Sequence, residues 1–258
     1  MAEAKTDSYK QFARFIAQTG DTYAFDGESS IAGLGIVFQV IQDMGLKPMH
    51  TEEFKRGILS LFNVEVLNMP DLDNSRLIFA PNHVSDLDAL ILGLLHPKIR
   101  IASKTDWTDN EKLKHFLGLH YDLQRLNRAC VQSLHTLLKS AVAYFNENTE
   151  SRHYLLFSQG TISDFNQNSL ERISKLAQKI SNKADVPIVP LFIEQPSLYH
   201  PTRIVFDAPM MVPPEADFRR IWLERETALQ NTLSPPARLP KLSHKHSNNN
   251  KPGDPFFP

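Results

Sequence analysis

From residue 63 onward, short apolar runs alternate with longer segments in which apolar positions recur every three or four residues. The short runs predict β-strands and the helical spacing predicts α-helices between them. We expect strands at 64–67, 77–80, 99–102, 121–123, 153–157, 187–193 and 203–206, and helices at 87–95, 109–117, 129–147, 170–182 and 215–233. This alternation is typical of an α/β fold, and it predicts a single domain with a largely parallel central sheet flanked by helices.

The first 62 residues have a different pattern, in which apolar side chains share one face of predicted amphipathic helices. Phe12, Phe15 and Ile16 fall on one such face, and a continuous apolar segment covers residues 31–41. A helix needs about 20 residues to cross a bilayer, so this segment predicts a buried or interfacial helix and not a spanning one. Because the first ten residues are polar and no apolar stretch follows them directly, a signal peptide is not expected.

These patterns divide the chain into an N-terminal helical segment over 1–62, an α/β domain over 63–233 and a tail over 234–258. The tail contains six prolines and three consecutive asparagines, a composition that does not form a buried core, so we expect it to be disordered. The remaining length is enough for a sizeable core. Oligomeric state does not follow from any of these patterns.

Net charge and cysteine content bear on nucleic-acid binding and on cysteine chemistry. The formal net charge of the 258 residues is −1, which gives no bulk attraction to nucleic acid, so a nucleic-acid partner is not expected. Cys130 is the one cysteine, so neither an intramolecular disulfide nor a cysteine metal cluster can form.

Candidate chemistry lies in polar clusters that follow predicted strands, where α/β sheets usually bind ligands. The first cluster is Asn82–Asp88. His83 can move a proton near neutral pH, and Asp88 can fix its tautomer and stabilise the imidazolium. Two alternatives stay open: Ser85 or Asp86 caps the next helix and His83 is an ordinary loop residue, or His83, Asp86 and Asp88 bind a metal ion.

Two further clusters offer groups that could hold an anion. Arg125 and Arg128 lie in the second, at 122–128, and their guanidinium groups suit phosphate, although they could equally begin a solvated helix. Gly160 and Thr161 lie in the third, at 157–163, where backbone amides could hold an anion or an oxyanion. An ordinary turn is the alternative interpretation of the third cluster.

In this order and spacing the clusters resemble the phospholipid/glycerol acyltransferase family, typified by lysophosphatidate acyltransferases. The first block of that family is Asn-His, four residues and Asp, which Asn82, His83 and Asp88 match. Its second block ends a short strand with an arginine, where Arg125 falls, and its fourth block, Val-Pro-Ile-Val-Pro, is identical to residues 186–190. Lys104 follows a predicted strand where the family often has lysine.

The third block departs from the family pattern. The family has Phe-Pro-Glu-Gly-Thr-Arg-Ser, whereas residues 157–163 are Phe-Ser-Gln-Gly-Thr-Ile-Ser. Gln159 replaces glutamate and Ile162 replaces arginine. A missing arginine removes a charge-assisted phosphate contact, worth about 1.5–3 kcal/mol. The acceptor is therefore open between a glycerol phosphate and a lyso-lipid without phosphate.

The resemblance implies an O-acyltransferase of phospholipid biosynthesis that moves a fatty acyl group from acyl-CoA or acyl carrier protein to a glycerol hydroxyl, most simply that of 1-acyl-glycerol-3-phosphate. His83 would be the general base and Asp88 would orient it, with no metal or other cofactor. Substrate contacts would come from Asn82, Lys104, Arg125, Ser158, Gln159, Gly160 and Thr161. A lipid substrate also implies peripheral contact with the cytoplasmic side of a membrane.

Two other classes of function compete with this prediction. A non-catalytic relative that binds lipid or acyl chains would explain the altered third block, but it would not need the intact His83 and Asp88. A hydrolase, in which water replaces the acceptor alcohol, is the other class, although a serine hydrolase is disfavoured because the chain has no Gly-x-Ser-x-Gly motif.

Overall fold

The structure is a computed structural model of the chain. It describes residues 62–85, 87–104, 122–127, 130–147, 151–160, 173–194 and 201–233, together with Lys55, Leu59 and Ser60. The amphipathic helices predicted in the first 50 residues, most of the helix expected before residue 63, the helix predicted over 109–117 and the tail over 234–258 lie outside the described residues.

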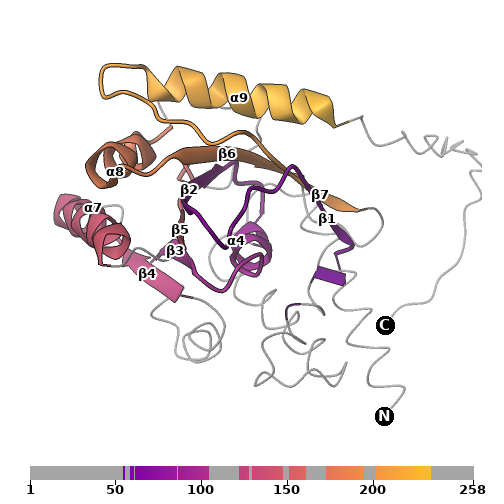
Figure 1. Cartoon of the computed structure of the whole chain (residues 1–258), viewed down its shortest axis with the longest axis horizontal. Helices are drawn as coiled ribbons and strands as arrows, with labels where there is room; N and C mark the ends of the chain where they lie inside the picture. Colours follow the sequence, from indigo (N-terminus) through magenta and orange to yellow (C-terminus); the bar gives the residue numbers. More distant parts are fainter. Residues whose placement is uncertain are drawn as a thin grey trace, which may run out of the picture.

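A seven-stranded sheet forms the centre of the described part of the chain (Figure 1). Its strands are β1 (Val64–Leu67), β2 (Arg76–Pro81), β3 (Ile99–Lys104), β4 (Asp122–Leu126), β5 (Arg152–Leu155), β6 (Ile188–Ile193) and β7 (Thr202–Phe206). They are arranged in the order β1-β7-β6-β2-β5-β3-β4, and only the β6–β7 pair is antiparallel. The predicted α/β class and the largely parallel sheet are therefore confirmed.

Helices cover both faces of this sheet (Figure 1). On one face lies α4 (Leu87–Gly93), and on the other lie α7 (Val131–Asn146), α8 (Leu176–Ala184) and α9 (Phe218–Thr232). Successive strand side chains point to opposite faces, so β2 contributes to both layers. Leu77 and Phe79 pack with α4, whereas Ile78 and Ala80 pack with the three-helix layer. None of the described helices has the length and apolar character that a membrane crossing requires.

Strand β2 lies at the point where the connections change direction. The chain leaves β2 through α4 to reach β3 on one side, and it later returns through α8 to place β6 on the other side. Ligands of open α/β sheets bind beyond the carboxyl end of the strands at such a switch point. The indole N–H of Trp222 on α9 donates to the carbonyl oxygen of Ala80 at 2.8 Å and anchors this end of β2 from the face that α9 covers.

Several boundaries differ from the sequence predictions, among them those of β4, α8 and α4. Strand β4 covers Asp122–Leu126 and not 121–123, because an edge strand can carry the polar side chains that were interpreted as a loop. Helix α8 begins at Leu176, whereas the predicted helix began at residue 170. The N–H of Ser174 donates to the carbonyl oxygen of Ser158 at 2.7 Å, which holds Ser174 outside the helix. Helix α4 ends at Gly93, and Leu94 and Leu95 follow in a tighter turn.

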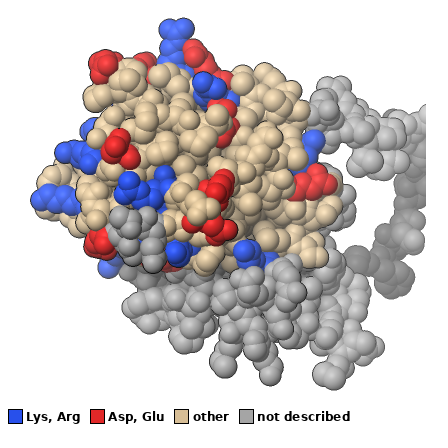
Figure 2. Space-filling view, viewed as in Figure 1, with Lys and Arg blue, Asp and Glu red and all other residues tan. Residues whose placement is uncertain are grey.

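Acidic and basic side chains are interspersed over the described surface in Figure 2. This distribution agrees with the formal net charge of −1. On this face the described Lys, Arg, Asp and Glu residues form no extended patch of one sign of charge.

Candidate active site

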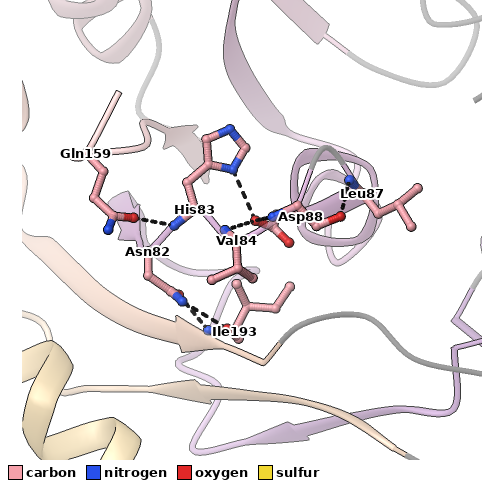
Figure 3. A network of polar contacts seen from close by, with 8 residues as sticks. Asn82, His83, Val84, Leu87, Asp88, Gln159 and Ile193 are labelled. Atoms are coloured by element: carbon pink, nitrogen blue, oxygen red, sulfur yellow. Dashed lines mark hydrogen bonds and ion pairs between the residues drawn. The ribbon is translucent and has the colours of Figure 1, made fainter. Parts of the chain in front are cut away.

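Asn82 is the first residue after β2, and its side-chain amide extends the pairing of β2 with β6 (Figure 3). Its Nδ2 donates to the carbonyl oxygen of Ile193 at 2.9 Å, and the N–H of Ile193 donates to its Oδ1 at 2.8 Å. Asn82 is completely buried, and its two hydrogen bonds to Ile193 fix the direction in which the chain leaves the sheet. Its predicted contact with substrate stays a prediction.

His83 and Asp88 form a hydrogen-bonded pair directly beyond this junction. His83 Nδ1 lies 3.0 Å from Asp88 Oδ2. His83 belongs to the loop and Asp88 to the first turn of α4, so the five-residue spacing joins a loop to a helix and does not have to fit within one helix. The side chain of Asp88 is 0% exposed and that of His83 is 10% exposed. The other ring nitrogen of His83, Nε2, points away from Asp88 (Figure 3).

The same carboxyl group also organises the start of α4. Asp88 Oδ2 accepts hydrogen bonds from the backbone N–H groups of Val84 at 2.7 Å and Ser85 at 2.8 Å. Ser85 Oγ accepts from the N–H of Leu87 at 3.1 Å. This reciprocal arrangement resembles a capping box. Capping by Ser85 therefore coexists with the His83–Asp88 pair, and Asp86 lies outside the described residues.

Opposing effects act on the ionisation of Asp88. Complete burial raises the pKa of its carboxyl group, and the hydrogen bonds from His83, Ser85 and Val84 oppose this rise. Asp88 Oδ1 has no hydrogen-bond partner among the described residues. An ionised Asp88 keeps the proton of His83 on Nδ1, which leaves the lone pair of Nε2 able to accept a proton.

The turn after β5 contacts His83 through two side chains. The ring of Phe157 stacks on the imidazole, with 4.0 Å between ring centroids and an interplanar angle of 26°. Gln159 Oε1 accepts a hydrogen bond from the backbone N–H of His83 at 2.5 Å. Gly160 adopts a positive φ of 75°, which glycine reaches without steric cost, and its N–H donates to the carbonyl oxygen of Phe157. The first and third predicted clusters are therefore in direct contact.

The remaining residues predicted to contact substrate are Ser158, Lys104, Arg125 and Thr161. Ser158 is completely buried, and its Oγ has no hydrogen-bond partner in the described part of the chain. Lys104 ends β3 and Arg125 is an exposed residue of β4. These strands lie two and three positions from β2 in the sheet, which corresponds to about 10 and 14 Å. Residues 122–126 of the second cluster thus lie on the edge strand itself and not beyond it. Thr161 and Arg128 lie outside the described residues.

Within the described ranges, no three His, Cys, Asp or Glu side chains gather at metal-binding distance.

The sequence analysis did not identify Ile193, whose backbone N–H and carbonyl oxygen bond to Asn82 at this site. No local signal could have identified it, because only the fold brings Ile193 next to Asn82.

A nearly buried His–Asp pair beyond the central strand of a mixed sheet supplies the groups that acid–base chemistry uses. The sequence profile of the family described as Acyltransferase matches residues 48–194. The chain belongs to this acyltransferase family, as the resemblance of its four blocks predicts.

Comparison with solved structures gives the same fold. The chain is similar to the crystal structure of the 1-acyl-sn-glycerophosphate (LPA) acyltransferase PlsC from Thermotoga maritima, with a TM-score of 0.52 and 16% sequence identity. The match covers 90% of this chain and 99% of that one. At this identity the likeness concerns the fold. No curated protein sequence matches the chain significantly.

Proposed function

We propose that the protein transfers a fatty acyl group from an acyl thioester to the free hydroxyl of a glycerol lipid, with 1-acyl-glycerol-3-phosphate as the acceptor, in phospholipid biosynthesis. The observation that carries this proposal is the His83–Asp88 pair, in which Nδ1 lies 3.0 Å from the carboxylate and Nε2 faces away from it. Membership of the acyltransferase family supports the reaction type.

In the proposed mechanism, His83 Nε2 takes the proton of the acceptor hydroxyl while the hydroxyl oxygen attacks the thioester carbonyl carbon. A C–O bond forms and the carbonyl π electrons move to oxygen, which gives a tetrahedral intermediate. Asp88 stabilises the imidazolium and keeps it oriented. Collapse of the intermediate breaks the C–S bond, and the departing thiolate takes the proton from Nε2. The products are an ester and a free thiol, without an enzyme nucleophile, a metal or another cofactor.

The acceptor headgroup is proposed to bind beside His83, at the carboxyl ends of the strands. Lys104 and Arg125 are the cationic residues proposed to contact its phosphate, and Gly160 and Thr161 are proposed to line its near side. Because Ile162 replaces the arginine of the family pattern, a lyso-lipid without phosphate is the alternative acceptor. The two acceptors differ in the charge that Lys104 and Arg125 would have to neutralise.

The donor is proposed to be acyl-CoA or acyl carrier protein, and the protein is proposed to act at the cytoplasmic surface of a membrane as a peripheral protein. Its lipid substrate supports membrane contact. Sedimentation with liposomes of phosphatidylglycerol and phosphatidylcholine tests this contact, and release by high salt or carbonate is the expected result. Retention after carbonate would contradict a peripheral association.

The reaction is tested by following free thiol release from oleoyl-CoA with lysophosphatidate, glycerol 3-phosphate, lysophosphatidylglycerol, a monoacylglycerol or no acceptor. We expect release that depends on lysophosphatidate and disappears in His83→Ala, while His135→Ala, a change at an exposed position of α7, stays active. Preference for monoacylglycerol would establish the alternative acceptor. No release from oleoyl-CoA or from oleoyl-acyl carrier protein with any acceptor would show that the protein is a non-catalytic relative.

A further inference from the structure

The turn after β5 carries a role that the acceptor-binding prediction does not include. Its side chains Phe157 and Gln159 contact His83 itself. We propose that Gln159 and Phe157 are positioning residues for His83, so that this turn acts as a clamp on the general base. The kinetic part of this inference rests on the proposed function, whereas its spectroscopic part does not.

Gln159 is 4% exposed, and its Oε1 accepts the backbone N–H of His83. Without that oxygen, the N–H of a nearly buried residue would lose its partner, and the loop would have to move to recover one. An acceptor oxygen is all that this contact needs, and both glutamine and glutamate supply one. This explains how Gln159 can replace the glutamate of the family pattern without loss of the base.

Phe157 fixes a different degree of freedom of the same residue. Asp88 holds one ring nitrogen of His83, but a hydrogen bond through a single atom still permits the ring to rotate about that atom. The phenyl ring stacked at 4.0 Å covers one imidazole face and limits this rotation. The direction of Nε2 is therefore set jointly by Asp88 and Phe157.

The sheet connects the two sides of this clamp rigidly. Strand β5, which leads into the turn, pairs with β2, which leads into His83, and the N–H of Leu156 donates to the carbonyl oxygen of Phe79 at 2.9 Å. Side chains held on paired strands are positioned more accurately than side chains held on independent loops. A general base misplaced by about 1 Å can lose about 100-fold in rate.

Kinetics distinguish positioning from acceptor binding. We expect Gln159→Leu and Phe157→Leu to lower kcat by about 10- to 100-fold with little change in KM for the acceptor. Gln159→Glu retains the acceptor oxygen and should recover most of kcat. The matched controls are Gln178→Leu, which removes hydrogen bonds to the carbonyl oxygens of Pro213 and Ala216, and Phe145→Leu in the core beside α7. Both controls should lose stability but keep kcat.

The second measurement does not require activity. In histidine-labelled protein, the proton on His83 Nδ1 should give a downfield NMR signal that is absent in His83→Gln. We expect Gln159→Leu and Phe157→Leu to broaden or remove this signal, Gln159→Glu to retain it, and both controls to leave it unchanged. Near-UV circular dichroism of each variant verifies that the fold is intact.

Each outcome is decisive for one of the two proposals. A raised KM with unchanged kcat and an unchanged proton signal in Gln159→Leu would overturn the clamp and return the residue to acceptor binding. If the wild-type enzyme is active, an unchanged Nδ1 proton signal in Gln159→Leu and Phe157→Leu would also overturn the clamp. If the wild-type protein transfers no acyl group but the signal still depends on Gln159, the clamp stands and the proposed function fails.

Discussion

The side-chain amide of Asn82 pairs with the backbone of Ile193, a residue 111 positions further along the chain, as a strand residue would. Pro81, the last residue of β2, has no N–H, and the side-chain amide of Asn82 joins the end of β2 to the end of β6. The loop that carries His83 is therefore attached to two central strands at the point where it leaves the sheet.

Removal of this amide should destabilise the fold and not only the site. We expect Asn82→Ala to lower the free energy of unfolding by about 2–4 kcal/mol, because two buried backbone groups of Ile193 lose their partner. Urea denaturation measures the loss. Asn182→Ala is the control: this exposed residue donates one hydrogen bond to the carbonyl oxygen of Val212, and its removal should cost less than about 1.5 kcal/mol. Equal losses in the two variants would contradict the role assigned to Asn82.

The Asp88→Asn variant should separate two roles of Asp88: its action on His83 and its hydrogen bonds to the backbone of the loop. The asparagine oxygen can still accept the N–H groups of Val84 and Ser85, but the variant has no negative charge to stabilise the imidazolium. We expect kcat to fall by about 1,000- to 10,000-fold, while KM for the acceptor changes little. Initial rates of thiol release measure both constants.

Asp122→Asn is the matched control for that variant, because Asp122 forms an ion pair with Arg100 on the neighbouring strand, away from His83. It should retain wild-type rates. A wild-type rate in Asp88→Asn would exclude Asp88 from orienting the base.

The sequence was sufficient to predict the sheet and the contact between His83 and Asp88 because both depend on local patterns. Alternating apolar runs located the seven described strands, and the spacing of His83 and Asp88 survives in the structure as a direct contact. Strand β4 was placed too early because its polar residues belong to an edge strand, where one side of the backbone faces solvent and apolar content is not required.

The support of the site could not be predicted in the same way. The contacts of Ile193 with Asn82 and of Gln159 with His83 span 111 and 76 residues, and only strand order brings them together. The place of Gln159 in a sequence block predicts a contact with the acceptor, but it does not reveal that the side-chain oxygen accepts the backbone N–H of His83. Sequence spacing within a loop does not reveal which side of the loop a side chain takes.

His153 should make stability depend on pH at the opposite end of the sheet. It is completely buried at the start of β5, and its Nε2 lies 2.9 Å from the carbonyl oxygen of Leu72. Burial lowers the pKa of His153 to about 4, although the contact with Leu72 opposes this shift. The unfolded chain therefore binds more protons between pH 6.5 and 4, and stability falls as the pH falls through this range, by about 3 kcal/mol in total.

Urea denaturation of wild type and His153→Gln at intervals from pH 4.5 to 7.5 checks this prediction. Glutamine can still donate to Leu72 but does not titrate, so the difference between the two curves isolates the histidine. We expect the wild-type advantage to shrink toward acid pH. Parallel curves across the range would show that His153 does not titrate differently in the folded and unfolded chain.

Glu226 should give a pH dependence of the opposite sign. This residue of α9 is 0% exposed, and neither carboxyl oxygen has a hydrogen-bond partner among the described residues. Burial raises the pKa of Glu226 well above its ordinary value, and the carboxylate of Asp207 adds to the rise, whereas the nearby N–H of Leu191 opposes it. The folded chain therefore keeps this proton at a pH where the unfolded chain has released it. Stability falls as the pH rises above the unfolded value of about 4.5.

Glu226→Gln removes the titrating group at nearly constant shape. At pH 8 we expect the free energy of unfolding of the variant to exceed that of wild type by about 1–3 kcal/mol. At pH 5 the difference between the two free energies should be smaller. Urea denaturation at both values measures this. Glu224→Gln on the same helix removes only an exposed ion pair with Arg220 and should change stability by less than about 0.5 kcal/mol at either pH. Trp222, which donates to Ala80, lies one turn before Glu226 on the buried side of α9. A loss of stability in Glu226→Gln would therefore contradict the prediction and mean that the carboxyl group helps to pack this helix against β2 and β6.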